Sequence, residues 1–274
     1  RPRRELDTFL GRSRNYRNLF NPSYGLMCPK GKNGNFQPDF DPLRWGDHFT
    51  EGNSWQYSWF VPHDVEGLSM LHGGLDKMFL KMDSVFTMRQ DYDISYYKRG
   101  IIHLIREMQS ADMGQYAHLN EPMHHMIYMY GFGQPWKTQY WSRKIMDRLY
   151  AATPDGYCGD EDNGQMSAWY IFSALGFYPL CPASNQYVFG SPLFRHAEMT
   201  LGNGCKVTVS APDNSPENVY VNSITVDGED YDRNFITYEM LGNGTEIKFE
   251  MSAKPERSRG ISAADRPFSL SSRQ

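Results

Sequence analysis

The sequence predicts a mainly helical chain that ends in an antiparallel β region. Two patterns indicate this class: apolar residues recur at three- and four-residue spacing through the first two-thirds, and alternate with polar residues from about position 186. A third observation is a set of Asn-Gly and Asp-Gly pairs, typical of tight turns, between the alternating segments. We therefore expect a helical region over residues 1–184 and an antiparallel β region over residues 185–274.

Four segments carry the helical prediction. A helix is expected after Gly73-Gly74, and the stretch 93–108 has a similar rhythm. Pro135 suits the first turn of a further helix, and a helix over Gln165–Leu175 should end at Gly176. The apolar face after the two glycines consists of Leu75, Met78, Phe79, Met82, Val85 and Phe86. Several helices with functional loops between them favour a helical array or toroid.

Short alternating runs predict the strands of the β region. The turn pairs are Asn203-Gly204, Asp227-Gly228 and Asn243-Gly244, and each is expected to close a hairpin. The runs lie at residues 206–210, 219–221, 224–226 and 246–250.

Composition narrows the class of function. The 274 residues are 40% apolar and 22% charged, which excludes disorder, and the net charge of −4 argues against nucleic acid as a partner. No run of about 18 apolar residues predicts a membrane span. Four cysteines without Cys-x-x-Cys spacing do not make a zinc framework. Aromatic residues at 15% fit a large core or a pocket with flat walls for sugars or bases.

The first of three polar clusters runs from Thr50 to Tyr57. Glu51 lies beside a glycine, an asparagine and two aromatic residues, where partial desolvation would raise the pKa of a carboxyl group. A general acid at neutral pH needs such a shift. The alternative is a glutamate placed at the start of a helix, where the helix dipole favours it.

The second cluster runs from His118 to His125. A helix beginning near Pro122 would place Glu121, His124 and His125 within one turn. Oxygen ligands from Asn120 and Glu121 would suit calcium better than zinc. The alternative is a helix-capping asparagine followed by structural histidines.

The third cluster is the acidic loop from Asp155 to Gln165. It is not an EF-hand, because Gly164 comes one position early and Ile171 stands where a bidentate glutamate is required. An apolar helix follows at once, so the loop is attached to a buried element. Two carboxylates that lie close together in it should titrate at different pKa values, because each disfavours the charged form of the other. An acidic surface loop that caps the helix is the alternative.

Acyl transfer, nucleotide hydrolysis and hydride transfer lack their usual motifs in this sequence. Carboxylates from separate segments together with many aromatic residues point to carbohydrate chemistry. Glycoside hydrolysis uses one protonated acid and one ionised base flanking a sugar ring.

Three blocks of sequence together are specific. They are the run from Glu51 to Asp64, the run from Asn120 to Thr138 that contains Gly133-Gln134-Pro135-Trp136, and the run from Gly159 to Tyr170 that leads to Gly176-Phe177-Tyr178-Pro179. In this order they resemble glycoside hydrolase family 92, the calcium-dependent exo-acting α-mannosidases. The resemblance covers most of the chain.

This resemblance implies part of an (α/α)6 toroid and an inverting release of terminal mannose from α-mannosides such as those of N-glycans, assisted by Ca²⁺. Position by position, it implies Glu51 as general acid, Asp162 as the base that activates water and Asp160 as its partner. Asn120 and Glu121 are implied as calcium ligands. The implied sugar contacts are Trp55, Gln56, His125, Trp136 and Gln165.

The resemblance also implies a periplasmic, secreted or cell-surface enzyme, and it leads us to expect an N-terminal β-sandwich domain of the same polypeptide outside this chain. Leu119 and Met123 stand where the family more often has small residues. Two alternatives remain at this point. One is a non-catalytic carbohydrate-binding protein, and the other is a different carbohydrate-active enzyme built on an (α/α)6 toroid.

Overall fold

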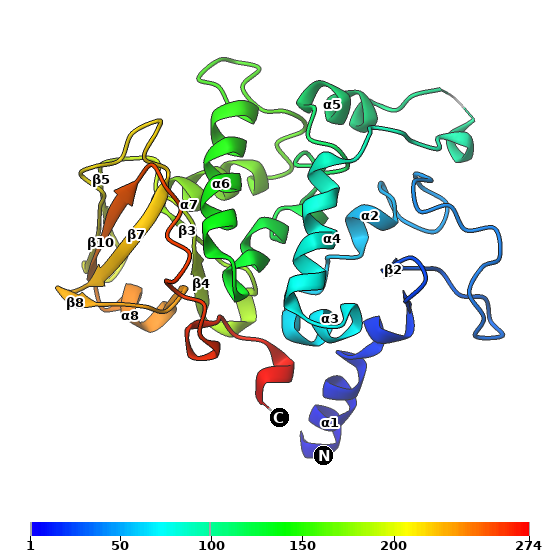
Figure 1. Cartoon of the computed structure of the whole chain (residues 1–274), viewed down its shortest axis with the longest axis horizontal. Coiled ribbons are helices and arrows are strands. Elements are labelled where there is room, and N and C mark those ends of the chain that lie inside the picture. Colours follow the sequence, from blue (N-terminus) through cyan, green and yellow to red (C-terminus); the bar gives the residue numbers. More distant parts are fainter. Residues whose placement is uncertain (1, 99, 274) are drawn as a thin grey trace. The chain divides into compact units, whose positions relative to one another are not determined.

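The computed structural model describes residues 2–98 and 100–273, which form two compact units (Figure 1). The N-terminal unit comprises residues 1–61 and 66–117, and the C-terminal unit comprises residues 62–65 and 118–274. Helices dominate the first two-thirds of the chain and β-sheets occupy the last third, as the sequence predicts.

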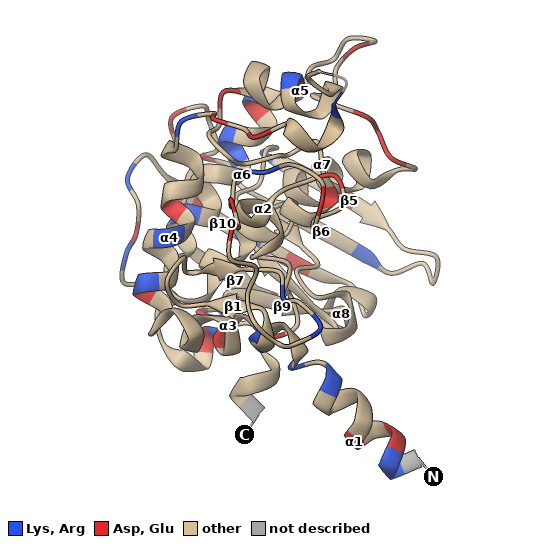
Figure 2. Cartoon of the chain, turned by 90° about the vertical axis from the view of Figure 1, so that its right-hand side faces the viewer, with Lys and Arg blue, Asp and Glu red and all other residues tan. Residues whose placement is uncertain are grey.

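The N-terminal unit is built from short helices and one two-stranded ribbon. Its longest helix is α4 (Leu75–Thr87), which begins directly after Gly74 and buries the apolar face predicted from its spacing. Both signs of charge mark α1 and α4 (Figure 2), as is usual for helices with one solvated face. The other elements are α1 (Pro2–Arg12), η1 (Asn15–Asn18), β1 (Phe20–Asn21), β2 (Leu26–Met27), α2 (Ser54–Tyr57), α3 (Val65–His72), η2 (Ser95–Tyr97) and α5 (His103–Ala111).

The stretch 93–108 differs from its prediction. Only its last part is α-helical, within α5, and the part before it holds the short 3-10 helix η2. Lys98 adopts a left-handed conformation at the end of η2, which stops the helix. The apolar rhythm before residue 98 therefore belongs to a loop, and residue 99 lies outside the described residues.

Two predicted helices of the C-terminal unit are confirmed. Helix α6 (Pro135–Leu149) starts at its proline, and α7 (Gln165–Leu175) ends at Gly176, whose φ of 90° is the left-handed conformation that favours glycine. The helix expected near Pro122 is a single 3-10 turn, η3 (Glu121–Met123), and a second 3-10 helix, η4 (Met126–Phe132), follows it.

The C-terminal unit holds two β-sheets. The larger has the strand order β5-β6-β10-β7-β8, and the smaller has the order β3-β4-β9. The larger sheet consists of β5 (His196–Thr200), β6 (Lys206–Ser210), β7 (Tyr220–Val226), β8 (Glu229–Asp230) and β10 (Thr245–Ser252). The smaller consists of β3 (Phe177–Tyr178), β4 (Gln186–Phe189) and β9 (Phe235–Thr237). The remaining elements are α8 (Tyr238–Gly242), η5 (Pro182–Ser184), η6 (Ala263–Asp265) and η7 (Leu270–Arg273).

The expectation of an antiparallel β region is wrong at one pairing. Strand β10 pairs antiparallel with β7 but parallel with β6, with Ile247 opposite Val209. The hairpin turns at Asn203-Gly204 and Asp227-Gly228 are confirmed, because they join β5 to β6 and β7 to β8. Asn243-Gly244 instead joins α8 to β10, and β10 can therefore insert between two strands that precede it in the chain.

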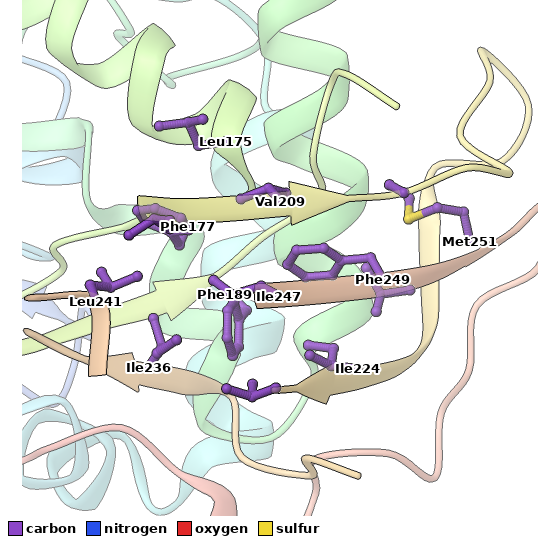
Figure 3. Packing of buried hydrophobic residues seen from close by; sticks show 14 residues of the cluster. Leu175, Phe177, Phe189, Val209, Ile224, Ile236, Leu241, Ile247, Phe249 and Met251 are labelled. Carbon is purple, nitrogen blue, oxygen red and sulfur yellow. The ribbon is translucent and has the colours of Figure 1, made fainter. Parts of the chain in front are cut away.

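The core of the C-terminal unit lies between the sheets and the end of α7. Phe249 and Ile247 of β10 are fully buried, and Leu175 and Phe177 belong to the same apolar cluster (Figure 3). This packing fixes the C-terminal end of α7. It therefore also fixes the axis of the helix and the position of Gln165, its first residue, which follows the acidic loop.

Candidate active site

Glu51 is presented by an unusual backbone conformation in the N-terminal unit. Its φ is +52°, its side chain is exposed, and the buried residues Gly52 and Asn53 follow it. A Cβ on Gly52 would lie 2.7 Å from Gln56 Oε1, so a larger residue there would have to displace the Gln56 side chain. A non-glycine residue at positive φ costs free energy, and such residues cluster at functional sites as well as at turns and helix ends.

The segment after Glu51 is anchored by buried hydrogen bonds. Asn53 Nδ2 donates to Gln115 Oε1 at 3.1 Å, and Gln115 Nε2 donates to the carbonyl oxygen of Asp91 at 3.1 Å. Gly46 N donates to Gly52 O at 2.9 Å. Burial, and secondly the charge of Glu51, raises the pKa of Tyr97, which places this phenol near the carboxylate. Tyr97 was not identified from sequence, because more than 40 residues separate it from Glu51.

The predicted sugar contacts in this unit are buried. Gln56 Oε1 accepts from Asn53 N at 3.3 Å, which caps α2. Trp55 is 8% exposed, and Lys81 Nζ lies 4.0 Å from the centroid of its ring. Their roles as sugar contacts stay predictions.

In the acidic loop of the C-terminal unit, one carboxylate is hydrogen-bonded to the protein and two are exposed. Glu161 receives hydrogen bonds from Gly164 N at 2.6 Å and Ser167 Oγ at 2.8 Å, and these bonds lower its pKa. It thus caps the start of α7, where an anion is favoured. Asp160 and Asp162 on either side of it remain exposed to solvent.

Asp162 is the electrostatic focus of this loop. Its φ is +54°, and its pKa is raised, first by partial burial and then by the charges of Glu121, Asp160 and Glu161. The structure therefore brings together the 120–121 and 160–162 segments, which the sequence keeps some 40 residues apart. Asn120 is buried, whereas Glu121 is exposed.

A buried histidine joins the two segments. His124 Nε2 lies 2.6 Å from the carbonyl oxygen of His118, and His124 Nδ1 lies 3.1 Å from Gln165 Nε2. Burial lowers the pKa of His124 to about 4. Sequence reasoning named the neighbouring His125, which is also buried, and missed this role of His124.

Trp136, the last predicted sugar contact, lies in the first turn of α6. The Arg257 guanidinium is 5.8 Å from its ring centroid, so the ring contacts the C-terminal segment. Among the described residues, no ring contact or hydrogen bond links Trp136 to the acidic loop. Its role as a sugar contact stays a prediction.

The donor chemistry at the 120–121 and 160–162 segments fits a hard cation. The side chains are carboxylates and an amide, and a cation held there would relieve the repulsion that raises the pKa of Asp162. Within residues 2–98 and 100–273, no group of three or more His, Cys, Asp or Glu side chains could hold a metal ion. Backbone carbonyls and ligand oxygens would therefore have to complete a calcium shell.

Glycoside hydrolysis uses a pair of carboxyl groups that flank the sugar, and Glu51, Asp160 and Asp162 are carboxylates on separate segments of this chain. The chain belongs to glycosyl hydrolase family 92, because residues 2–253 match the catalytic domain of that family.

Solved structures agree with this assignment. The chain is 44% identical to a family 92 inverting mannosidase from Bacteroides thetaiotaomicron, with a TM-score of 0.85, over 97% of this chain and 36% of that one. It is 36% identical to a family 92 α-mannosidase of the same organism, with a TM-score of 0.82, over 93% of this chain and 32% of that one.

One curated relative is more distant. An uncharacterized secreted glycosidase of Arthroderma benhamiae is 25% identical over an alignment of 295 positions that covers 97% of this chain and 35% of the relative. The chain thus spans about a third of the length of the proteins it matches. No helix among the described residues is long and apolar enough to cross a membrane.

Proposed function

We propose that this chain is the catalytic portion of an exo-acting α-mannosidase that releases terminal mannose from α-mannosides such as N-glycans with inversion. The observation that carries the proposal is the electrostatic coupling of Asp162 to Glu121 and Asp160, in a chain whose family is established. A carboxylate with a raised pKa can accept a proton from water as a general base when it is ionised.

In this proposal Asp162 activates water, Asp160 supports it, and Glu51 donates a proton to the leaving oxygen. Inversion requires the acid and the base on opposite faces of the sugar ring, with room for water at the base. The left-handed backbone at Glu51 and Asp162 supports the assignment, since strain of this kind collects at functional sites.

Asn120 and Glu121 are the proposed calcium ligands. Bound Ca²⁺ would supply positive charge to polarise sugar hydroxyl groups. The protein residues position the ligands. Asn120 is buried, and Glu161 accepts a hydrogen bond from Gly164 N that fixes the loop carrying Asp160 and Asp162.

The finer architecture also belongs to this proposal. The helices would form part of an (α/α)6 toroid within residues 1–184, followed by the β region 185–274. The remainder of the polypeptide, with an N-terminal β-sandwich domain, would supply the other part. The name of the secreted relative supports an extracytoplasmic location.

Three measurements on the full-length protein test the function. Glu51→Gln and Asp162→Asn should each abolish hydrolysis of an unactivated α-mannobioside, and product released by the wild type should appear first as the β-anomer in NMR spectra. Chelation should inactivate, and added calcium should restore activity. Mannose binding without any turnover by the wild type would instead establish a carbohydrate-binding protein, and an α-anomer product would exclude inversion.

A further inference from the structure

The hydrogen bonds of His124 determine which of its ring nitrogens carries a proton. The carbonyl oxygen of His118, 2.6 Å from Nε2, can only accept a hydrogen bond. The proton is therefore on Nε2. The backbone of His124 is fixed as well, because Trp169 Nε1 donates to the His124 carbonyl oxygen at 3.0 Å.

The ring of His124 is neutral at ordinary pH. It is 1% exposed, and burial outweighs the hydrogen bond to His118 and the charge of Asp162, so its pKa falls to about 4. With its single proton on Nε2, the neutral ring has a lone pair on Nδ1. Nδ1 is an obligate acceptor.

This acceptor fixes the orientation of the Gln165 amide. The group 3.1 Å from Nδ1 must be the donor, the NH2 of Gln165, because the carbonyl oxygen of the amide would face a lone pair. The same NH2 reaches Tyr178 Oη at 3.4 Å. Both amide protons are thus used inside the protein. No donor from the described residues reaches Oε1.

We propose that His124 is a positioning residue that holds the side-chain amide of Gln165 in one orientation, so that Gln165 offers a ligand only its carbonyl oxygen. Gln165 lies three residues after Asp162 and its backbone N donates to the Asp162 carbonyl oxygen at 3.2 Å. The ligand group selected would be a donor, such as a sugar hydroxyl. The inference rests on the proposed function only in taking the ligand to be a sugar.

The phenol that receives the second amide proton is itself held in place. The Tyr178 ring stacks on Tyr128, with centroids 4.8 Å apart and planes 19° apart. Tyr128 Oη lies 2.7 Å from Ser173 Oγ in the interior of the unit. Gln165 is therefore held from two sides, by an imidazole and by a stacked phenol.

Two substitutions of His124 separate positioning from a purely structural role. In His124→Asn the short amide can place an acceptor near the position of Nδ1 and lose the bond to His118. In His124→Gln the longer amide can keep the donor near Nε2 and lose the acceptor for Gln165. Both variants are neutral and polar, so they are matched in charge.

The assay is steady-state hydrolysis of an α-mannobioside by the full-length protein, with thermal denaturation measured in parallel. We expect His124→Gln to raise KM about tenfold, the effect of losing one neutral hydrogen bond, and His124→Asn to raise it less. A structural role predicts the reverse order, because His124→Gln keeps the buried carbonyl oxygen of His118 paired. Equal KM values for the two variants, or the reverse order, would overturn the proposal.

A second measurement does not depend on catalysis. In protein labelled with ¹⁵N-histidine, NMR at pH 7 should show His124 as a neutral ring protonated on Nε2, with His124→Gln identifying the resonance. A ring protonated on Nδ1, or a charged ring, would overturn the orientation argument even if the enzyme is active. If the wild type binds no mannoside while the NMR result holds, the proposed function fails and the orientation of Gln165 stands.

Discussion

Asn234 is a buried residue whose side-chain amide connects three segments by hydrogen bonds, and its substitution should destabilise the C-terminal unit. It is 1% exposed, and its Nδ2 donates to Gly131 O at 2.7 Å and Gly260 O at 2.5 Å. Its Oδ1 accepts from Arg259 Nη1 at 3.3 Å. One amide therefore joins η4, the loop before β9 and the C-terminal segment.

Asn234→Asp keeps the shape of the side chain and removes its NH2. Two buried carbonyl oxygens then lose their donor and face an oxygen atom, and each loss costs about 1–3 kcal/mol. Arg259 offsets part of this cost, because its guanidinium favours a carboxylate. We expect a fall of about 2–4 kcal/mol in the free energy of unfolding.

Urea denaturation followed by tryptophan fluorescence measures this change. The matched control is Asn222→Asp, the same substitution at an exposed position of β7, which should change the free energy of unfolding by less than about 0.5 kcal/mol. Equal stabilities of the two variants would refute the assignment of Asn234 as a connector.

Three further predictions concern stability. Phe249→Ala, at the centre of the apolar cluster, should cost about 3–5 kcal/mol in urea denaturation. Gly114→Ala should lower the melting temperature, because φ is +63° and the new Cβ would overlap the Val85 carbonyl oxygen; an unchanged melting temperature would contradict this steric clash. Burial lowers the pKa of His72 to about 4, so the unfolded chain binds the proton first and stability should fall as pH drops from about 6.5 to 4. His72→Phe, which retains stacking on Trp59, should reduce that slope; an unchanged slope would remove His72 as its source.

Local signals account for what the sequence predicted correctly. Helix α7 ends where Gly176 allows a left-handed residue, and β7 and β8 turn at Asp227-Gly228, because each feature depends on a few adjacent residues. The parallel pairing of β10 with β6 joins strands that lie far apart in the chain, with β7, β8, β9 and α8 between them, and no short motif encodes that pairing. The apolar rhythm before α5 was misleading, since it matched a helix but served a loop.

The candidate site divides in the same way. Glu121, Asp160 and Asp162 were proposed because the blocks of sequence that hold them resemble those of the family, and their roles stay predictions. The connection through His124 could not be proposed in this way, since His124 and Gln165 are 41 positions apart and the tautomer depends on a backbone carbonyl oxygen.

Glu51 and Asp162 share one local arrangement although they lie in different units. Each adopts a left-handed backbone, with φ of +52° and +54°, and each comes shortly before a helix, α2 or α7, with a glycine between. A left-handed conformation costs a residue with a Cβ about 1–2 kcal/mol, and glycine adopts it freely. Glycine would relieve this backbone cost at both positions.

Asp162→Gly should therefore separate stability from activity. It removes the backbone strain and the repulsion from Glu121 and Asp160, while the added flexibility of the unfolded chain costs about 0.5–1 kcal/mol. The expected result is a melting temperature equal to or slightly above that of the wild type, with hydrolysis of α-mannobioside abolished. Asp155→Gly, in the same loop at an ordinary backbone conformation, is the control and should gain no stability. If Asp162→Gly melts well below the control, Asp162 supports the fold, and its strained backbone is no longer an argument for catalysis.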